Sequence, residues 1–73
     1  MSFELARLAF SDPFAVARED RRESYDERRY VLLGVAQGRL LHVAYALPGE
    51  RVRIISARTA ESRERRRYHE GDG

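Results

Sequence analysis

The stretch of sequence around which the chain is organised is Arg51-Val52-Arg53-Ile54-Ile55-Ser56-Ala57-Arg58. Arginine and apolar side chains alternate over its first four residues, and this alternation predicts a strand with one apolar and one basic face. We expect the strand over residues 51–57, with Arg58 just past its end, where the chain turns. Arginines on the open face of a small sheet favour a polyanionic ligand, because each guanidinium presents a planar fork to phosphate or carboxylate.

Two apolar runs upstream predict the partners of this strand. Residues 30–36 and 39–46 flank Gln37-Gly38, which is typical of a two-residue hairpin turn. Pro48-Gly49 predicts the next turn, so the hairpin and the strand at 51–57 form an antiparallel meander. A short apolar run at residues 14–18 adds an edge strand, and the charged residues 19–29 form an exposed loop.

A helix is expected at each end of this sheet. The first helix is expected over residues 2–10, with Ser2 as its N-cap and its C-terminal end before Pro13. One wide face of this helix is apolar and must pack on another part of the protein. Residues 59–69 form the second helix, with Thr59 as N-cap, and this helix is polar on almost every side. The predicted fold is therefore α+β: a three- to four-stranded antiparallel sheet with an N-terminal and a C-terminal helix.

Composition limits what such a chain can do. Its 73 residues suffice for one small domain, and the absence of cysteine removes disulfides and thiolate metal sites. No metal-ligand spacing or glycine-rich phosphate loop occurs, so no cofactor is expected. No apolar run is long enough for a membrane span and no signal peptide is evident, which favours the cytoplasm. The sequence contains arginine but no lysine. Residues 1–50 carry seven arginines and eight acidic residues, and residues 51–73 carry seven arginines and four acidic residues, so the C-terminal third is the basic part.

The candidate site combines Arg51, Arg53 and Arg58 with two side chains of the last helix, Glu64 and Tyr68. The arginines suit phosphate binding and stabilisation of a developing negative charge, and the carboxylate or phenol suits proton transfer. The alternative is a solvated arginine-rich face, with Glu64 in an ion pair inside its own helix and Tyr68 packed on the sheet. Spacing by itself leaves both interpretations open.

The two histidines also have two interpretations. His42 lies in the middle of a predicted strand, on the face shared with Leu40 and Ala44. His69 lies near the end of the last helix, where a cation suits the helix dipole. For each, a structural role is simpler than a catalytic one, because a lone ionisable group is weak support for a site.

The run at residues 53–60, followed by Glu64-Arg65 and residues 68–70, resembles the signature of the BrnT family, ribonuclease toxins of bacterial type II toxin–antitoxin systems. Residues 2–13 resemble the second helix of that family and the turn after it. Glu27-Arg28, Gly34 and the segment at 38–41 resemble its central hairpin. The resemblance thus extends over almost the whole chain.

This resemblance implies a RelE-like α+β fold and metal-independent cleavage of RNA, in which the 2′-hydroxyl attacks the adjacent phosphate. It also implies a partner antitoxin of the BrnA type, a DNA-binding protein through which the toxin contacts DNA only indirectly. The resemblance makes seven residues of this sequence candidates for the roles found in the family. The catalytic candidates are Arg53, Arg58, Glu64 and Tyr68, and the RNA-binding candidates are Arg28, Arg39 and Arg51.

One departure from the family pattern concerns the N-terminus. Members usually begin with an extra strand and helix that contain a Trp-Asp pair and a Lys-His-Gly segment, whereas this sequence has neither tryptophan nor lysine. We therefore expect residues 1–73 to be a single BrnT-like domain without that first strand and helix. Two alternatives to an active toxin stay open: an inactive truncated remnant that keeps an antitoxin-binding or nucleic-acid-binding surface, and a nucleic-acid-binding module without chemistry.

Overall fold

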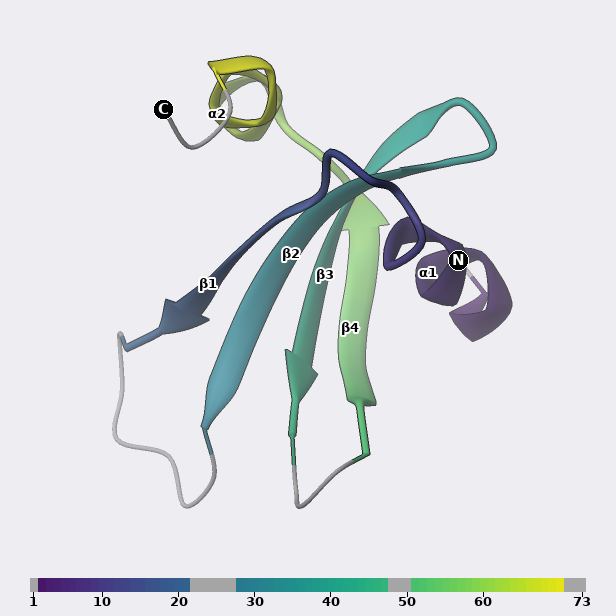
Figure 1. The fold of residues 1–73 in the computed structure, drawn as a ribbon, viewed down its shortest axis with the longest axis vertical. Coiled ribbons are helices and arrows are strands. Elements are labelled where there is room, and N and C mark those ends of the chain that lie inside the picture. Colours follow the sequence, from purple (N-terminus) through teal and green to yellow (C-terminus); the bar gives the residue numbers. More distant parts are fainter. Residues whose placement is uncertain (1, 22–27, 48–50, 71–73) are drawn as a thin grey trace.

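The computed structural model describes residues 2–21, 28–47 and 51–70, and these form two helices and one sheet (Figure 1). In chain order the elements are α1 (Phe3–Ala9), β1 (Val16–Asp20), β2 (Arg29–Ala36), β3 (Arg39–Ala46), β4 (Arg53–Thr59) and α2 (Ser62–Glu70). The sheet has the order β1-β2-β3-β4 with every neighbouring pair antiparallel. The predicted α+β fold with a helix at each end is confirmed.

The β2–β3 hairpin is the centre of the sheet, and the sequence predicted it almost residue by residue. Its turn places both Gln37 (φ 50°) and Gly38 (φ 79°) in the left-handed region. Two central residues with positive φ match the twist of the flanking strands, which explains why so short a loop suffices. Leu41 and Val43 on β3 are the largest fully buried side chains.

Helix α1 covers one face of the sheet. The Ser2 hydroxyl accepts a hydrogen bond from the Leu5 N–H (3.2 Å) and caps the helix. Ala6 and Ala9 are completely buried against the strands. The expected packing of the apolar face is confirmed for these residues, while Phe3 and Leu8 of the same helix remain exposed (61% and 45%).

The close approach of α1 to the sheet requires glycine at position 34. A Cβ atom at Gly34 would lie 2.5 Å from the carbonyl oxygen of Ala9, well inside van der Waals contact. The C-terminal end of α1 therefore rests directly on the backbone of β2.

Strand β4 differs from the prediction at both ends. It begins at Arg53 rather than Arg51 and extends to Thr59, so Arg58 lies within the strand instead of beyond it. The register shifts by one residue between Ala44 and Tyr45 of β3, which leaves Ile55 as an extra residue in a bulge. The bulge interrupts the simple alternation from which the strand bounds were predicted.

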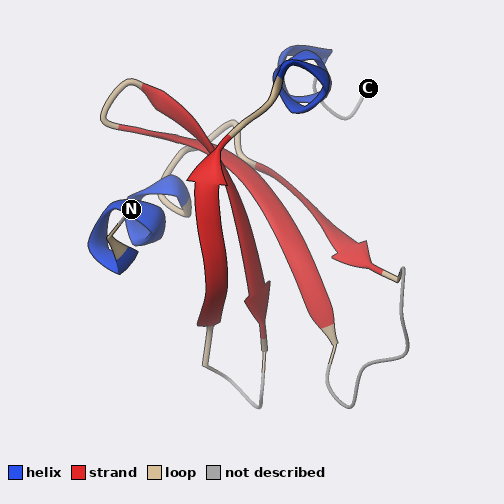
Figure 2. Ribbon diagram, turned by 180° about the vertical axis from the view of Figure 1, so that it is seen from behind, coloured by secondary structure: helices blue, strands red, loops and turns tan. Residues whose placement is uncertain are grey.

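Helix α2 begins three residues later than expected, at Ser62, and Thr59 is not its N-cap. The Ala60 N–H donates to the Leu40 carbonyl oxygen (2.9 Å), so the chain stays attached to β3 as far as residue 60. α2 then lies across the end of the sheet, as Figures 1 and 2 show from opposite sides. None of its residues is buried, in agreement with the predicted polar helix.

The remaining differences concern loops and edges. The edge strand predicted at 14–18 exists as β1, displaced by two residues, because the Asp12 carboxylate and carbonyl hold residues 14 and 15 in a turn (2.9 and 3.0 Å). Of the predicted loop at 19–29, Glu19, Asp20 and Arg29 belong to strands, and residues 22–27 lie outside the described residues. The predicted Pro48-Gly49 turn and the tail at 71–73 also lie outside them.

Candidate functional site

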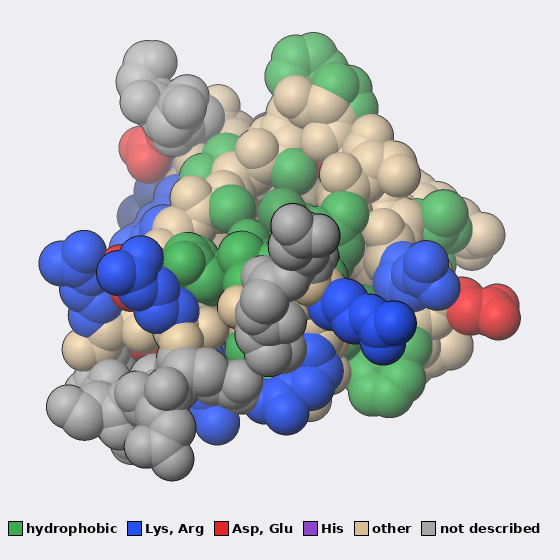
Figure 3. All heavy atoms as spheres, turned by 60° about the horizontal axis from the view of Figure 1, so that its bottom comes forward, with side chains coloured by type: hydrophobic (Ala, Val, Ile, Leu, Met, Phe, Trp, Pro, Cys, Tyr) green, Lys and Arg blue, Asp and Glu red, His purple; other side chains and the backbone are tan. Residues whose placement is uncertain are grey.

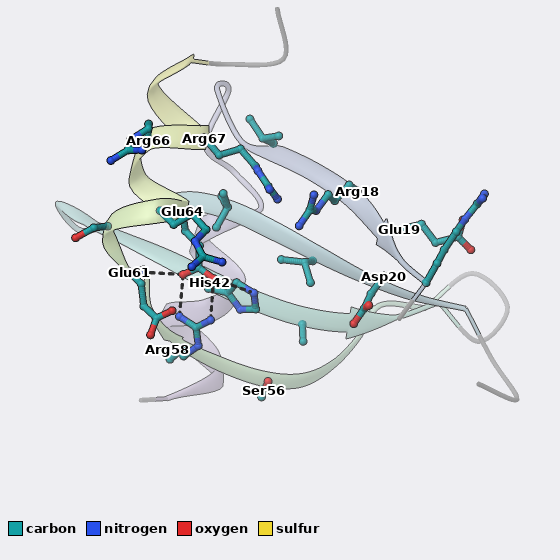
Figure 4. A pocket seen from close by; sticks show the side chains of 17 residues that line it. Arg18, Glu19, Asp20, His42, Ser56, Arg58, Glu61, Glu64, Arg66 and Arg67 are labelled. Carbon is teal, nitrogen blue, oxygen red and sulfur yellow. Dashed lines mark hydrogen bonds and ion pairs between the residues drawn. The ribbon is translucent and has the colours of Figure 1, made fainter. Parts of the chain in front are cut away.

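A groove of about 1190 Å³ lies on the face of the sheet opposite α1, and α2 forms its wall at one end (Figure 4). Small and apolar side chains of the strands form its floor, among them Val31, Leu33 and Ala44. Its rim is charged: six arginines and four acids line it, namely Arg18, Arg21, Arg58, Arg63, Arg66 and Arg67 with Glu19, Asp20, Glu61 and Glu64. The groove is therefore a polar channel over an apolar floor.

Arg58 and Glu64 form a two-point ion pair in the groove. The two guanidinium nitrogens Nη1 and Nη2 donate to Glu64 Oε1 and Oε2, both at 2.8 Å. The Glu61 N–H donates to the same Oε1 (2.8 Å), so Glu64 also caps the helix in which it lies. This fork fixes the first turn of α2 over the end of β4.

These contacts keep Glu64 ionised. The hydrogen bond from Arg58 holds its pKa at about 2, with smaller contributions from the Glu61 N–H and from His42, against the opposing effect of burial. The same pair raises the pKa of Arg58. Glu64 is thus a fixed anion that cannot supply a proton near neutral pH, and its role is to hold its two basic neighbours.

His42 is the second basic neighbour of Glu64. It pairs across the strands with Arg58, and its Nε2 lies 3.5 Å from Glu64 Oε2. Its side chain is only 17% exposed, and Figure 4 shows the ring in the groove between the strands and the α2 carboxylate. The groove thus places a histidine, an arginine and a carboxylate together, which is a set of groups suited to binding an anion and moving a proton.

Tyr68 lies elsewhere. Its ring packs on the buried Leu33, Leu40 and Ala60, and its hydroxyl donates to Asp12 Oδ2 (2.5 Å). This hydrogen bond raises the pKa of Tyr68 to about 12 and lowers that of Asp12. Tyr68 is not among the residues that line the groove, so its visible contacts are those of an anchor for α2.

The predicted site residues are therefore only partly brought together. Arg58 and Glu64 meet in the groove. Arg53 lies on the same face of the sheet as Arg58, because their cross-strand partners, Ala46 and His42, share one face of β3. Arg53 is nevertheless on the order of 15 Å from Arg58 along β4. It does not line the groove. The exposed RNA-binding candidates Arg28, Arg39 and Arg51 also lie outside it.

The groove also contains residues that sequence reasoning missed. His42 was left with a structural role, and Arg18 on β1 and Arg67 on α2 were not singled out. The cross-strand pairing of His42 with Arg58 was the missing signal, because it depends on the bulge in β4. Arginine side chains also occur elsewhere on the surface, beside apolar ones, on the face drawn in Figure 3.

Two absences concern the described residues. No group of three or more His, Cys, Asp or Glu side chains is arranged to hold a metal ion in that part of the chain. Within the same residues, neither helix has the length and apolar composition that crossing a bilayer requires.

A small antiparallel sheet with an arginine-lined groove, closed at one end by a polar helix, defines the class: an α+β protein with a helix at each end of the sheet. The comparison with protein families goes further. Residues 1–64 match the family described as ribonuclease toxin, BrnT, of type II toxin–antitoxin system. The chain belongs to this family, and the resemblance seen in the sequence is confirmed. No significant match was found among curated proteins.

Proposed function

We propose that this chain is an endoribonuclease toxin that cleaves RNA in the groove without a metal ion. The observation that carries the proposal is the cluster of Arg58, Glu64 and His42 in an arginine-lined groove of a chain from a ribonuclease toxin family. RNA supplies both the phosphates that arginine forks bind and the 2′-hydroxyl that acts as an internal nucleophile.

In the proposed reaction, His42 accepts the proton of the 2′-hydroxyl, and the 2′-oxygen forms a bond to the adjacent phosphorus. The bond from phosphorus to the 5′-oxygen breaks, and this oxygen takes a proton from solvent. The products are a 2′,3′-cyclic phosphate and a 5′-hydroxyl end. Arg58 stabilises the negative charge on the phosphoryl oxygens, and Glu64 holds Arg58 in place and favours the imidazolium of His42.

The experiment is an RNA cleavage assay with analysis of the product ends, carried out with and without EDTA. We expect Arg58→Ala to lower kcat/KM by about 10²–10³-fold and His42→Ala by about 10²–10⁴-fold. Arg7→Ala is the matched control, because Arg7 is an exposed arginine of α1 on the other side of the sheet. Full activity of the His42 variant would contradict the assignment, as would loss of activity on chelation.

Arg58→Lys separates chemistry from folding. Lysine keeps the positive charge beside Glu64 but loses the two-point contact with the carboxylate and with a phosphate. We expect a folded protein with a melting temperature close to the wild type and a reduced kcat. If Arg58→Lys and the wild type cleaved RNA equally well, the guanidinium fork would have no catalytic role.

We further propose a BrnA-like antitoxin as the partner, with both proteins in the cytoplasm. The family supports an antitoxin. Exposed apolar side chains on α1 (Phe3 and Leu8) and on or just before the neighbouring β4 (Val52 and Ile55) support a protein contact beside the sheet rather than in the groove. Co-expression with the product of an adjacent antitoxin gene should relieve growth arrest. Phe3→Ser with Leu8→Ser should weaken that rescue while RNA cleavage persists; unchanged rescue would exclude this surface.

A further inference from the structure

Two arginines of the groove stand apart from the Arg58–Glu64–His42 cluster. Arg18 comes from β1 and Arg67 from α2, and both side chains extend into the groove from opposite walls (Figure 4). Within the part of the chain that the structure describes, neither makes an ion pair or a hydrogen bond. Among the described residues, these two guanidinium groups therefore have no acidic partner.

The nearby acids are engaged by other groups. Glu19 of β1 forms an ion pair with Arg21 (2.9 Å), and Glu64 of α2 is held by Arg58. Asp20 also has an interaction partner in the structure. Two like charges that face the same space repel each other, and a bound anion between them removes that repulsion.

The course of α2 explains why Arg67 approaches β1 rather than β4. The helix starts at the end of β4, where Glu64 meets Arg58, and its Tyr68 contacts the β2 and β3 side chains Leu33 and Leu40. Arg67 follows Glu64 by three residues, so it lies on the same side of the helix and about 4.5 Å further along it. Arg18 pairs with Val31, whose side chain lies in the groove floor, so β1 contributes its arginine to the same face.

The spacing across the sheet separates this pair from the catalytic cluster. β1 and β4 are the two edges of a four-stranded sheet, so three strand spacings, or about 14 Å, lie between the backbones of Arg18 and Arg58. Glu64 also holds the Arg58 guanidinium at the β4 edge, so Arg18 at the β1 edge is placed to contact a different phosphate. Residues of both edge strands line the groove, so different phosphates of one nucleotide chain can contact its two ends.

We infer that Arg18 and Arg67 form a second phosphate subsite, which binds an RNA phosphate flanking the one held at Arg58. The inference rests on the proposed function, because it assigns the strand of RNA a path across the sheet from β4 to β1. It makes Arg18 and Arg67 determinants of affinity and of the minimum substrate length, with no part in bond cleavage. An arginine fork binds phosphate and carboxylate in the same two-point way, and the RNA of the proposed function supplies phosphates to this groove.

The test measures binding of 2′-O-methyl oligoribonucleotides, which lack the nucleophile and cannot be cleaved, at several salt concentrations. The variants are Arg18→Ala, Arg67→Ala and the double variant. Arg65→Ala is the control, since Arg65 is an exposed arginine of the same helix that does not line the groove. Melting temperatures close to the wild type establish that each variant is folded.

We expect the double variant to lower affinity for a tetranucleotide about tenfold. The slope of log K against log salt should fall by about 0.7, the value for one phosphate on a single strand, rather than the ~1.4 expected for two separate phosphates. A dinucleotide with a single phosphate should lose less affinity in the double variant than the tetranucleotide does, because it cannot contact Arg58 and the second subsite at the same time.

The outcomes separate this inference from the proposed function. Length-dependent loss of binding in the double variant supports the subsite even if the wild type cleaves no RNA. Equal binding of all oligonucleotides by the wild type and the double variant would overturn the subsite, whether or not RNA is cleaved. Weakened antitoxin binding with unchanged oligonucleotide binding would also overturn it, because the two arginines would then serve a protein partner.

Discussion

Removal of one hydroxyl group, in Tyr68→Phe, separates the anchor of α2 from the chemistry of the groove. The hydroxyl donates to Asp12 Oδ2, and the same carboxylate accepts the N–H groups of Val35 (2.8 Å) and Phe14 (2.9 Å). The phenylalanine ring retains the packing of Tyr68 on Leu33. The substitution therefore removes a single hydrogen bond between residues 56 positions apart.

The expected magnitude follows from these contacts. A hydrogen bond to a charged group contributes about 1.5–3 kcal/mol. The Asp12 carboxylate keeps two backbone donors in the variant, so no buried charge is left without a partner, and we expect a loss of about 1–2 kcal/mol. For a domain of this size that lowers the melting temperature by roughly 5–15 °C.

A double-mutant cycle with Asp12→Ala, followed by urea unfolding, isolates this bond. Asp12→Ala should cost more than Tyr68→Phe, because it also removes the turn contacts to Val35 and Phe14. The coupling between the two changes should be about 1–2 kcal/mol. Tyr30→Phe is the matched control, since the Tyr30 hydroxyl makes no hydrogen bond within the described residues.

The pH dependence of this coupling has two limits. The pKa of Tyr68 is raised to about 12, so its contribution is complete below its ordinary value near pH 10 and is lost as the pH rises toward 12. The pKa of Asp12 is lowered, so the contribution is present above its ordinary value of 3.8 and is lost as the pH falls through the lowered value. The coupling should therefore be constant across the neutral range.

Two results would refute this reasoning. A coupling energy below about 0.3 kcal/mol would mean that the hydrogen bond does not hold α2 in solution. A folded Tyr68→Phe protein that bound uncleavable RNA like the wild type, but lost RNA cleavage by about 100-fold or more, would show that the phenol acts in the chemistry, as proposed for it from its residue type. We expect cleavage within a few-fold of the wild type below the melting temperature.

Other positions give further predictions. Gly34→Ala should destabilise the protein by about 1–3 kcal/mol in urea unfolding, because the new methyl group meets the Ala9 carbonyl oxygen at 2.5 Å. A smaller effect would mean that α1 moves away from β2 without cost. Glu64→Gln should make the free energy of unfolding depend less on pH in the acidic range. The ionised Glu64 contributes about 1–2 kcal/mol, and this contribution is present above about pH 4.5 and is lost as the pH falls to about 2. Equal acid unfolding midpoints of the variant and the wild type would contradict this. Gln37→Asn should raise the melting temperature, with a gain of about 0.5–1 kcal/mol, because asparagine before Gly38 suits the positive φ of this turn; an unchanged melting temperature would count against strain at Gln37.

The sequence predicted the parts of the fold that depend on local pattern. The β2–β3 hairpin follows from two apolar runs around Gln37-Gly38, and the ends of α1 follow from Ser2 and the residues before Pro13. These features are fixed by contacts within a few residues, so a single sequence contains the required information.

The parts that sequence reasoning missed depend on contacts between distant residues. The position of Arg58 inside β4 and its pairing with His42 result from the bulge at Ile55, and nothing in the local alternation marks that bulge. The partner of Tyr68 is an aspartate 56 residues earlier in the chain. The sequence therefore grouped Arg58 with Glu64, which the structure brings together, but it left out His42. The catalytic role of Tyr68 stays a prediction.

The polar character of α2 links the stability of the fold to the geometry of the groove. A helix with no buried residue cannot be held by an apolar stripe, so its position depends on the contacts of Glu64 near its start and of Tyr68 near its end. Between these two anchors lie Arg66 and Arg67, which line the groove. Loss of either anchor should therefore change the position of the groove arginines as well as the stability. For this reason a loss of RNA binding in an anchor variant says little about that residue alone. Substitutions that keep the anchors, such as Arg18→Ala and Arg67→Ala, test the groove itself.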